Sequence, residues 1–388
     1  MDQKTRGTSP ATERAQSRGA TIAVVGASAR AAALSVLRSG RRAVAADLFA
    51  DADLRRVCPA TRISPYPAGL VDWLRDAPCD GWLYTGALEN YPELVDELAT
   101  LKPLLGNPGN VLRRVRDPLL LQQVLQEHGF SFPETRASSD GLPRDGSWLA
   151  KTYRGSSGVG VSEWDSATSN CGFFQRRIHG DACSALFAGG VLLGATRQLV
   201  GEAWTGASRF QYCGSLAPWP LTADTERSLR TLGEALVEEF DLVGLFGVDF
   251  IFDGREAWTI EVNPRYTASA EVVEQAGNTC VIDWHVASHQ RRLTPPPAVD
   301  YSSTSHGKAI LFAKLATTVS HEFTSWALTQ SDLVDIPLAG SSIAAGQPLL
   351  TVRAEAGKLP LILSALKSRM GQVERLLREG IETCDWES

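Results

Sequence analysis

The residues of this 388-residue chain with the clearest chemical potential lie in the segment LFGVDFIFDGREAWTIEVNPR, residues 245–265. Two short apolar runs in this segment are typical of neighbouring strands joined at an Asp-Gly turn. Asp249 lies on the first run, and Glu261 and Asn263 lie on the second. Because side chains alternate between the two faces of a strand, the loop length decides whether both carboxylates share a face. An odd loop would place Asp249 opposite Glu261, whereas a two-residue turn would put them on different faces.

Two carboxylates that face each other in an apolar hairpin repel one another and are costly to desolvate unless a cation lies between them. Oxygen ligands of this kind suit Mg²⁺ or Mn²⁺. Asn263 faces the same side as Glu261 and can add a neutral oxygen, and Arg265 would bring a planar cation suited to a phosphoryl or carboxylate oxygen. We therefore predict a metal site at Asp249, Glu261 and Asn263. The alternative is that these residues form the solvated face of an ordinary hairpin.

A second segment, WLAKTYRGSSGVGV at residues 148–161, contains a lysine at the end of an apolar run. Small residues follow Lys151 in a flexible loop, namely Gly155, Ser156, Ser157 and Gly158. Such residues let backbone N–H groups approach phosphate oxygens, and the lysine supplies a positive charge. The loop lacks the Walker A pattern and leads into a strand, so it predicts a different kind of phosphate loop. A structural Gly-Ser hairpin is the alternative.

The surrounding pattern predicts a chain of several domains with mixed α/β and α+β structure. A strand, helix and strand from Thr21 onward begin a parallel α/β unit. Short strands rich in β-branched and aromatic residues follow Lys151, and a helix at about 223–240 precedes the metal segment. The predicted units are a disordered tail at 1–20, an α/β domain at 21–110, a β-rich domain at 111–293, a linker at 294–307 and an α+β module at 308–388.

Composition excludes several classes of partner. Thirty-eight Lys and Arg against forty-four Asp and Glu give a net charge of −6, which offers no broad positive field for nucleic acid. The seven cysteines include no C-x-x-C pair and are typical of a reducing compartment. No apolar run approaches the length of a membrane helix. We expect a cytoplasmic protein without nucleic-acid or membrane partners.

Together the two segments resemble the ATP-grasp superfamily of ATP-dependent ligases, in which an acid followed by E-x-N holds Mg²⁺. The resemblance extends over the whole ordered chain. It implies a Rossmann-like pre-ATP-grasp domain at 21–110, an ATP-grasp domain at 111–293 and a small C-terminal domain similar to that of biotin carboxylase, marked by DIP at Asp335. It also implies that ATP binds with Mg²⁺ or Mn²⁺, and that Lys151 and Arg265 are catalytic.

The adenine site is also given by this resemblance. The hinge strand of the family corresponds here to QRRIHGD. The resemblance places Gln175 and Arg176 near the adenine amino group, the Ile178 amide at a ring nitrogen, and Asp181 within reach of the ribose.

Two departures from the family pattern affect the expected chemistry. Many relatives carry a D-K dipeptide whose lysine touches the nucleotide phosphates, whereas this chain reads Asp117-Pro118. Three arginines are candidates to replace that cation, namely Arg113, Arg114 and Arg116. The chain also lacks the Q-V-E segment that biotin carboxylases use for bicarbonate, so carboxylation of biotin is disfavoured.

The resemblance implies an ATP-dependent carboxylate–amine ligase that works through an acyl phosphate. The small-molecule acceptor would be gripped by Arg209, Tyr212 and Tyr266. Relatives suggest a link to one-carbon cofactors of the methanopterin or methanofuran type, and a homodimer. One alternative is a degenerate ATP-grasp sensor or scaffold without turnover. Another is a dinucleotide-binding protein with Gly26 and Asp47, although two of the three fingerprint glycines are absent.

Overall fold

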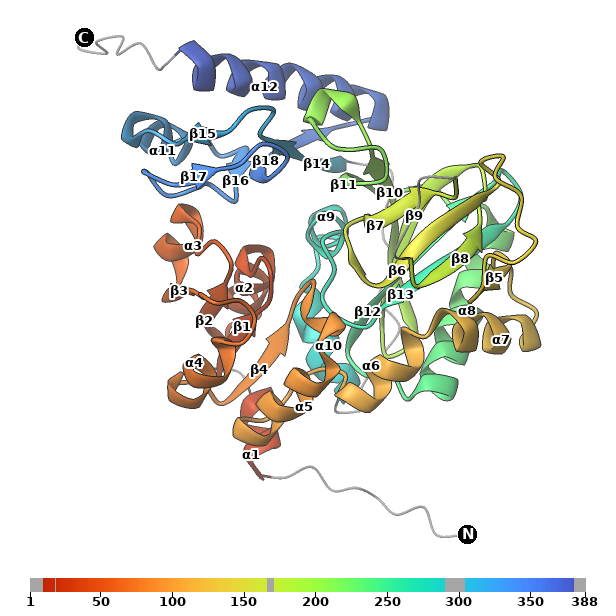
Figure 1. The fold of residues 1–388 in the computed structure, drawn as a ribbon. Coiled ribbons are helices and arrows are strands. Elements are labelled where there is room, and N and C mark those ends of the chain that lie inside the picture. The colour runs from red at the N-terminus through yellow and green to blue at the C-terminus, as the bar shows by residue number, and fades with distance from the viewer. Residues whose placement is uncertain (1–9, 18, 166–170, 290–303, 380–388) are drawn as a thin grey trace.

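A computed structural model of the chain describes residues 10–17, 19–165, 171–289 and 304–379. Figure 1 shows the described residues arranged as an N-terminal α/β domain, a central domain and a C-terminal module. None of the helices in these ranges is both long enough and apolar enough to cross a membrane.

The N-terminal domain contains a four-stranded sheet with strand order β3-β2-β1-β4, in which every pairing is parallel. Its strands are β1 (Thr21–Val25), β2 (Arg42–Asp47), β3 (Ala60–Arg62) and β4 (Gly81–Tyr84). Its helices after the first strand are α2 (Arg30–Arg38), α3 (Ala52–Val57), α4 (Leu70–Asp76), η1 (Leu88–Asn90) and α5 (Pro92–Leu101). After α5, Leu104 forms an isolated parallel bridge with Trp82 of β4.

The expectation of a disordered tail over 1–20 is wrong for part of that range. Helix α1 spans Pro10–Gln16, and Ala15 is fully buried. Arg14 Nε lies 2.7 Å from Asp80 Oδ1, next to β4. A Cβ on Gly81 would lie only 2.7 Å from that of Ala15, so the absent side chain at Gly81 makes room for the helix. A small apolar contact with a distant strand orders a segment whose composition is polar.

The central domain combines two sheets. A four-stranded sheet has the order β5-β8-β6-β7, and an eight-stranded sheet has the order β13-β12-β9-β10-β11-β14-β18-β16. The smaller sheet consists of β5 (Thr135–Arg136), β6 (Trp148–Ser156), β7 (Val159–Glu163) and β8 (Phe173–Arg176). The larger sheet takes from this domain β9 (Asp181–Ala188), β10 (Val191–Val200), β11 (Tyr212–Ala217), β12 (Leu245–Phe252) and β13 (Ala257–Asn263).

Helices of the central domain follow the apolar spacing of the sequence. The helix predicted at about 223–240 is α8 (Ala223–Phe240), and its Thr222 side chain caps the helix by accepting the Thr225 N–H at 3.1 Å. The remaining helices are α6 (Gly109–Val115), α7 (Pro118–Glu127), η2 (Ala203–Thr205), α9 (Ala270–Ala276) and α10 (Val281–His289).

The C-terminal module continues the large sheet of the central domain. Strand β14 (Ser305–Phe312) pairs with β11, so that Gly214 lies opposite Ala309. The predicted linker therefore ends earlier than expected, because 305–307 belong to β14, while 290–303 lie outside the described residues. The other elements are β15 (Thr317–Thr318), α11 (His321–Ala327), β16 (Leu333–Val334), β17 (Ser342–Ile343), β18 (Pro348–Ala356) and α12 (Leu359–Glu379).

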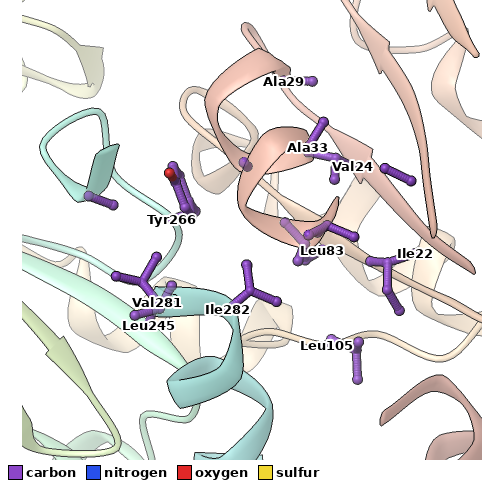
Figure 2. Close-up of a cluster of buried hydrophobic side chains, with 14 of the residues drawn as sticks. Ile22, Val24, Ala29, Ala33, Leu83, Leu105, Leu245, Tyr266, Val281 and Ile282 are labelled. Carbon is purple, nitrogen blue, oxygen red and sulfur yellow. The ribbon is translucent and has the colours of Figure 1, made fainter. Parts of the chain in front are cut away.

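A shared apolar core holds the N-terminal and central domains together. Figure 2 shows Ile22, Val24 and Leu83 from the parallel sheet, with Leu245 and Ile282 from the central domain in the same cluster. These five side chains are at most 2% exposed. Burial of apolar surface contributes about 25 cal/mol per Å². The interface therefore places the loops of the N-terminal domain firmly beside the β12–β13 hairpin.

Candidate active site

The β12–β13 hairpin brings Asp249 directly opposite Glu261. Its loop, residues 253–256, has four residues, so it is neither the two-residue turn nor the odd loop considered from the sequence. Near the loop Phe250 pairs with Thr259, but the next pair is Asp249 with Glu261, because a bulge leaves Ile260 without a partner. One extra residue in β13 restores the parity that the even loop would have broken.

Two amide side chains contact this pair. Asn263 Nδ2 donates to Asp249 Oδ2 at 3.0 Å and to Glu261 Oε1 at 3.1 Å. Gln198 Nε2 on β10 donates to Asp249 Oδ1 at 2.9 Å, across the intervening strand β9. The predicted metal-binding residues therefore lie together, held by two neutral amide groups.

The two carboxylates have opposite pKa shifts. Desolvation, followed by the charge of Glu261, raises the pKa of Asp249 to about 7. Glu261 is accessible to solvent. Desolvation by the protein around it opposes its ionisation, but the charges of Arg116 and Lys151 outweigh this effect and lower its pKa. A pair in which one carboxyl group has a raised pKa and the other has a lowered pKa is suited to bind a cation and release a proton.

The residues present fit a divalent cation with oxygen ligands. No group of three His, Cys, Asp or Glu side chains in the described part of the chain is arranged to hold a metal. The possible donors are instead the oxygens of two carboxylates and Asn263 Oδ1, which suit Mg²⁺ or Mn²⁺. In this structure Asn263 Nδ2 faces the carboxylates, and Oδ1 accepts from Arg265. The raised pKa of Asp249 marks a charge that the protein alone does not neutralise.

Lys151 approaches the carboxylate pair from the smaller sheet. Its Nζ donates to Gln175 Oε1 at 2.6 Å, and Gln175 Nε2 in turn donates to Thr135 Oγ1 at 3.3 Å. Desolvation lowers the pKa of Lys151, while the charges of Glu261 and Asp249 partly oppose this shift. The lysine is thus held by a buried amide and lies within the electrostatic field of the carboxylate pair.

The glycine-rich loop forms the tight turn of the β6–β7 hairpin. Ser156 pairs with Val159, and Ser157 and Gly158 between them have φ of 53° and 80°. The loop tip lies against the start of β11, because Tyr212 N donates to Ser157 O at 3.0 Å. A Cβ on Gly158 would lie 1.8 Å from Phe210 O, so only glycine allows this approach.

Of the three arginines near the absent lysine, only Arg116 turns toward the site. Arg113 pairs with Glu93 and Asp96, and Arg114 pairs with Asp241 at 3.4 Å. Arg116 Nη2 instead donates to Asn90 Oδ1 at 3.1 Å and to the Gly155 carbonyl at 3.3 Å. Its charge also lowers the pKa of Glu261. Pro118 itself starts helix α7 and is buried.

Arg265 connects the hairpin to the N-terminal domain. Its Nε lies 2.7 Å from Glu89 Oε1 on η1, and both side chains are largely buried. Nη2 donates to Asn263 Oδ1 at 3.1 Å, and Nη1 donates to the Tyr266 carbonyl at 3.3 Å. The predicted catalytic arginine therefore contacts a predicted metal ligand in this structure.

The remaining predicted nucleotide-binding residues line β8 and the start of β9. Arg176 is exposed and lies 4.0 Å from Glu134, while Ile178 is half-buried after β8. Asp181 forms an ion pair with Arg197 at 3.2 Å. Gln175 points at Lys151 and Thr135, so its side chain is engaged within the protein.

The three predicted acceptor-binding residues lie in different surroundings. Arg209 is exposed and forms an ion pair with Glu163 on β7 at 2.6 Å. Tyr212 shares a hydrogen bond of 2.8 Å with Ser215. Tyr266 is 4% exposed and belongs to the apolar cluster of Figure 2. Tyr266 is thus placed in the core between domains, away from any open surface.

Sequence reasoning missed Gln198, Glu89 and Asn90. Gln198 lies on the same face of β10 as Thr196, but its register against β12 is a long-range property. Glu89 and Asn90 lie in LENYP, a polar pair shortly after strand β4 of the N-terminal domain. The carboxyl ends of parallel strands commonly carry binding loops, which is the one signal that could have found them.

Comparisons with known proteins agree with this architecture. Residues 115–269 match the family described as the ATP-grasp domain. An uncharacterised protein of Methanocaldococcus jannaschii is 22% identical over 267 residues, which cover 65% of this chain. This chain spans 64% of that relative, which is less than two thirds of its length.

Solved structures share the fold over most of the chain. The N5-carboxyaminoimidazole ribonucleotide synthetase of Thermus thermophilus matches with a TM-score of 0.65 at 17% identity, covering 94% of this chain and 100% of that one. Biotin carboxylase of Campylobacter jejuni gives 0.66 at 12%, covering 93% and 97%. The L-amino acid ligase of Bacillus licheniformis gives 0.65 at 14%, covering 92% and 98%. The three-part α/β and α+β fold expected from the sequence is confirmed.

Proposed function

Because this chain carries an ATP-grasp domain at residues 115–269, we propose that it is an ATP- and Mg²⁺-dependent ligase that joins a carboxylate to an amine. The observation that carries the proposal is the opposition of Asp249 and Glu261, joined by Asn263, in a site that also contains Lys151. A partly buried carboxylate with a pKa near 7 has little structural purpose unless a cation shares its site.

The proposed reaction has two steps. A carboxylate oxygen of the substrate attacks the γ-phosphorus of ATP, the bond to the bridging oxygen breaks, and ADP leaves with the electron pair. The amine nitrogen then attacks the acyl carbon, the carbon–oxygen bond breaks, and inorganic phosphate leaves as the nitrogen loses a proton. Such transfers need positioning and charge neutralisation rather than a nucleophilic side chain.

Different residues of the site would have different roles in these two steps. Asp249, Glu261 and Asn263 would hold the divalent ion, which supplies positive charge to the triphosphate. Lys151, oriented by its bond to Gln175, would supply a point charge to the phosphates. The backbone of the glycine-rich loop, residues 155–158, would add N–H donors. Arg265 would meet the transferred phosphoryl group or the acceptor carboxylate.

Arg116 would replace the lysine that Pro118 excludes. Its guanidinium reaches the Gly155 carbonyl and is close enough to Glu261 to lower the pKa of that carboxyl group. Neither Arg113 nor Arg114 is comparably placed, since surface acids bind both. The cation is thus supplied from the C-terminal end of α6 rather than from the start of α7.

The acceptor site belongs to the same proposal. Arg209 and Tyr212 flank the segment that touches the glycine-rich loop, and Arg209 offers an exposed guanidinium to a carboxylate. The L-amino acid ligase among the structural neighbours supports an amino acid or small amine as the second substrate. A role in one-carbon cofactor biosynthesis, a cytoplasmic location and a homodimer stay predictions from the sequence.

The test is amine-dependent release of ADP and phosphate from Mg²⁺-ATP across a panel of carboxylates and amines, with the amide identified by mass spectrometry. Glu261→Gln is expected to lower the rate by about 100-fold or more, because it removes a charged ligand. Glu256→Gln is the matched control, since Glu256 lies in the loop of the same hairpin and binds Ser131 at 2.8 Å. A Glu261→Gln chain that works at a near normal rate would refute the mechanism. ATP binding without turnover on any mixture would favour a sensor instead.

A further inference from the structure

The 3₁₀ turn η1, Leu88–Asn90, reaches the candidate active site from the N-terminal domain. It follows Ala87, whose φ of 73° turns the chain sharply after β4. Leu88 and Glu89 are 0% and 2% exposed. A charged residue buried to this extent is costly unless it is paired, so its position needs an explanation.

Glu89 is paired with Arg265. The two side chains are 1% and 11% exposed, and the Nε to Oε1 distance is 2.7 Å. In the described chain, neither carboxylate oxygen of Glu89 receives an aligned hydrogen bond. The two side chains are therefore held together by attraction between their charges, and this attraction is strong because little water lies around them. The pair joins the α/β domain to the end of the β12–β13 hairpin.

Arg265 connects Glu89 to the predicted metal-binding residues. Its Nη2 donates to Asn263 Oδ1, and the Asn263 amide nitrogen donates to Asp249 and Glu261. A continuous chain of polar contacts thus runs from Glu89 to both carboxylates. Gly86 lies beside Arg265, since a Cβ added at Gly86 would be 3.5 Å from the Arg265 Cζ, an ordinary van der Waals contact.

The turn η1 also contacts the glycine-rich loop and Arg116 on the other side of the site. Asn90 Nδ2 donates to the Gly155 carbonyl at 3.3 Å, and Asn90 Oδ1 accepts from Arg116 at 3.1 Å. Adjacent residues of η1 therefore contact the metal-binding hairpin and the glycine-rich loop.

We propose that Glu89 is a positioning residue that holds Arg265 in place for ligation, so that the N-terminal domain sets the geometry of the metal-binding hairpin. This inference rests on the proposed ligase function. In this role Glu89 needs no contact of its own with ATP or the ion. It acts by keeping the Arg265 guanidinium against the Asn263 amide, and removing its charge leaves that guanidinium buried and unpaired.

The test compares Glu89→Gln, Glu89→Asp and the control Asp283→Asn. Asp283 on α10 pairs with Arg41 at 2.9 Å, so the control removes an ion pair between the same two domains without touching the site. Glu89→Gln is expected to lower kcat by about 10- to 100-fold with a KM for ATP changed less than about threefold, as for lost outer contacts of a metal ligand. Glu89→Asp, which keeps the charge, is expected to recover part of kcat. Asp283→Asn is expected to keep kcat within about twofold.

A second readout does not depend on turnover. Mn²⁺ affinity in the presence of β,γ-imido-ATP, followed by electron paramagnetic resonance, is expected to fall by about 10-fold or more in Glu89→Gln and to stay unchanged in Asp283→Asn. Arg265→Gln is expected to lower Mn²⁺ affinity by a similar factor. The double variant with Glu89→Gln and Arg265→Gln is expected to bind Mn²⁺ no more weakly than the single variant with the lower affinity.

Equal kcat and equal Mn²⁺ affinity in folded Glu89→Gln and wild-type chains would overturn the proposal. It would also be overturned if the losses of Mn²⁺ affinity caused by Glu89→Gln and Arg265→Gln multiplied in the double variant. Thermal unfolding shows whether each variant folds. If Glu89→Gln does not fold, Glu89→Asp decides, because a wild-type kcat and Mn²⁺ affinity in a chain with a shortened carboxylate would exclude precise positioning. If the wild-type chain showed no turnover, only the ligase proposal would fail, and the Mn²⁺ affinities would still test Glu89.

Discussion

Arg30 and Glu271 form a two-point ion pair between the N-terminal and central domains, with Nη1 to Oε1 at 2.7 Å and Nη2 to Oε2 at 3.0 Å. Arg30 is 1% exposed and Glu271 is 3% exposed. Lys308 from β14 lies 2.9 Å from Glu271, and Asp335 lies 2.6 Å from Arg30 Nε. Desolvation opposes the charge on Glu271, but Arg30 and Lys308 hold its pKa well below the ordinary value. All three parts of the molecule meet in this cluster.

Arg30→Met is therefore expected to destabilise the protein by about 3–5 kcal/mol, because Glu271 and Asp335 lose a buried partner. Urea denaturation followed by circular dichroism measures the change. Arg75→Met is the control, since Arg75 and Asp72 form an exposed pair whose loss is expected to cost less than about 1 kcal/mol. Equal midpoints for both variants would contradict a stabilising role for the buried pair.

Arg116→Gln is expected to raise the KM for ATP by about 10- to 100-fold, since a charged contact with phosphate contributes about 1.5–3 kcal/mol. Arg113→Gln is expected to leave KM within about twofold, because surface acids bind that side chain. Steady-state kinetics at saturating second substrate measures both values. Similar KM values for the two variants would show that Arg116 does not replace the missing lysine.

Gly158→Ala is expected to lower kcat by about tenfold or more, because the new Cβ would collide with Phe210 O and displace the loop. Gly141→Ala introduces a side chain at a similar φ, 71° against 80°, but nothing lies within 4 Å of its Cβ. Both variants pay a comparable backbone cost, so kcat for the pair isolates the effect of the collision. Equal rates would mean that the loop moves without consequence.

Metal affinity is expected to rise with pH until about pH 7. The pKa of Asp249 is raised to about 7, so the metal-free protein binds a proton there that a cation must displace. The same shift makes the metal-free native state bind more protons than the unfolded state, so this group destabilises the native state as pH rises from its ordinary pKa to about 7. Mn²⁺ titration calorimetry in buffers of different ionisation enthalpy should show proton release at pH 6 and little at pH 8.5. Asp249→Asn should abolish that release, and proton release that persists in Asp249→Asn would assign it to another group.

Local patterns in the chain were sufficient for much of this structure. Apolar spacing predicted α8 with its observed bounds, and alternation placed Asn263 and Glu261 on one face of a strand. The glycine-rich hairpin after Lys151 could also be located, because turn residues and β-branched runs act within a few positions of the chain. Each of these features depends on neighbours in the sequence, whose conformational preferences are short-range.

Relationships between distant segments required the folded chain. The bulge that brings Asp249 opposite Glu261 replaces the odd loop that alternation alone demanded. Gln198 reaches Asp249 only through the register of three strands. Glu89 meets Arg265 because two domains pack through a shared apolar core, and no pattern around either residue encodes the other. Strand register and domain packing are decided by burial of surfaces far apart in the chain, so the chemistry of single residues was readable from the sequence while their partnerships were settled by tertiary structure.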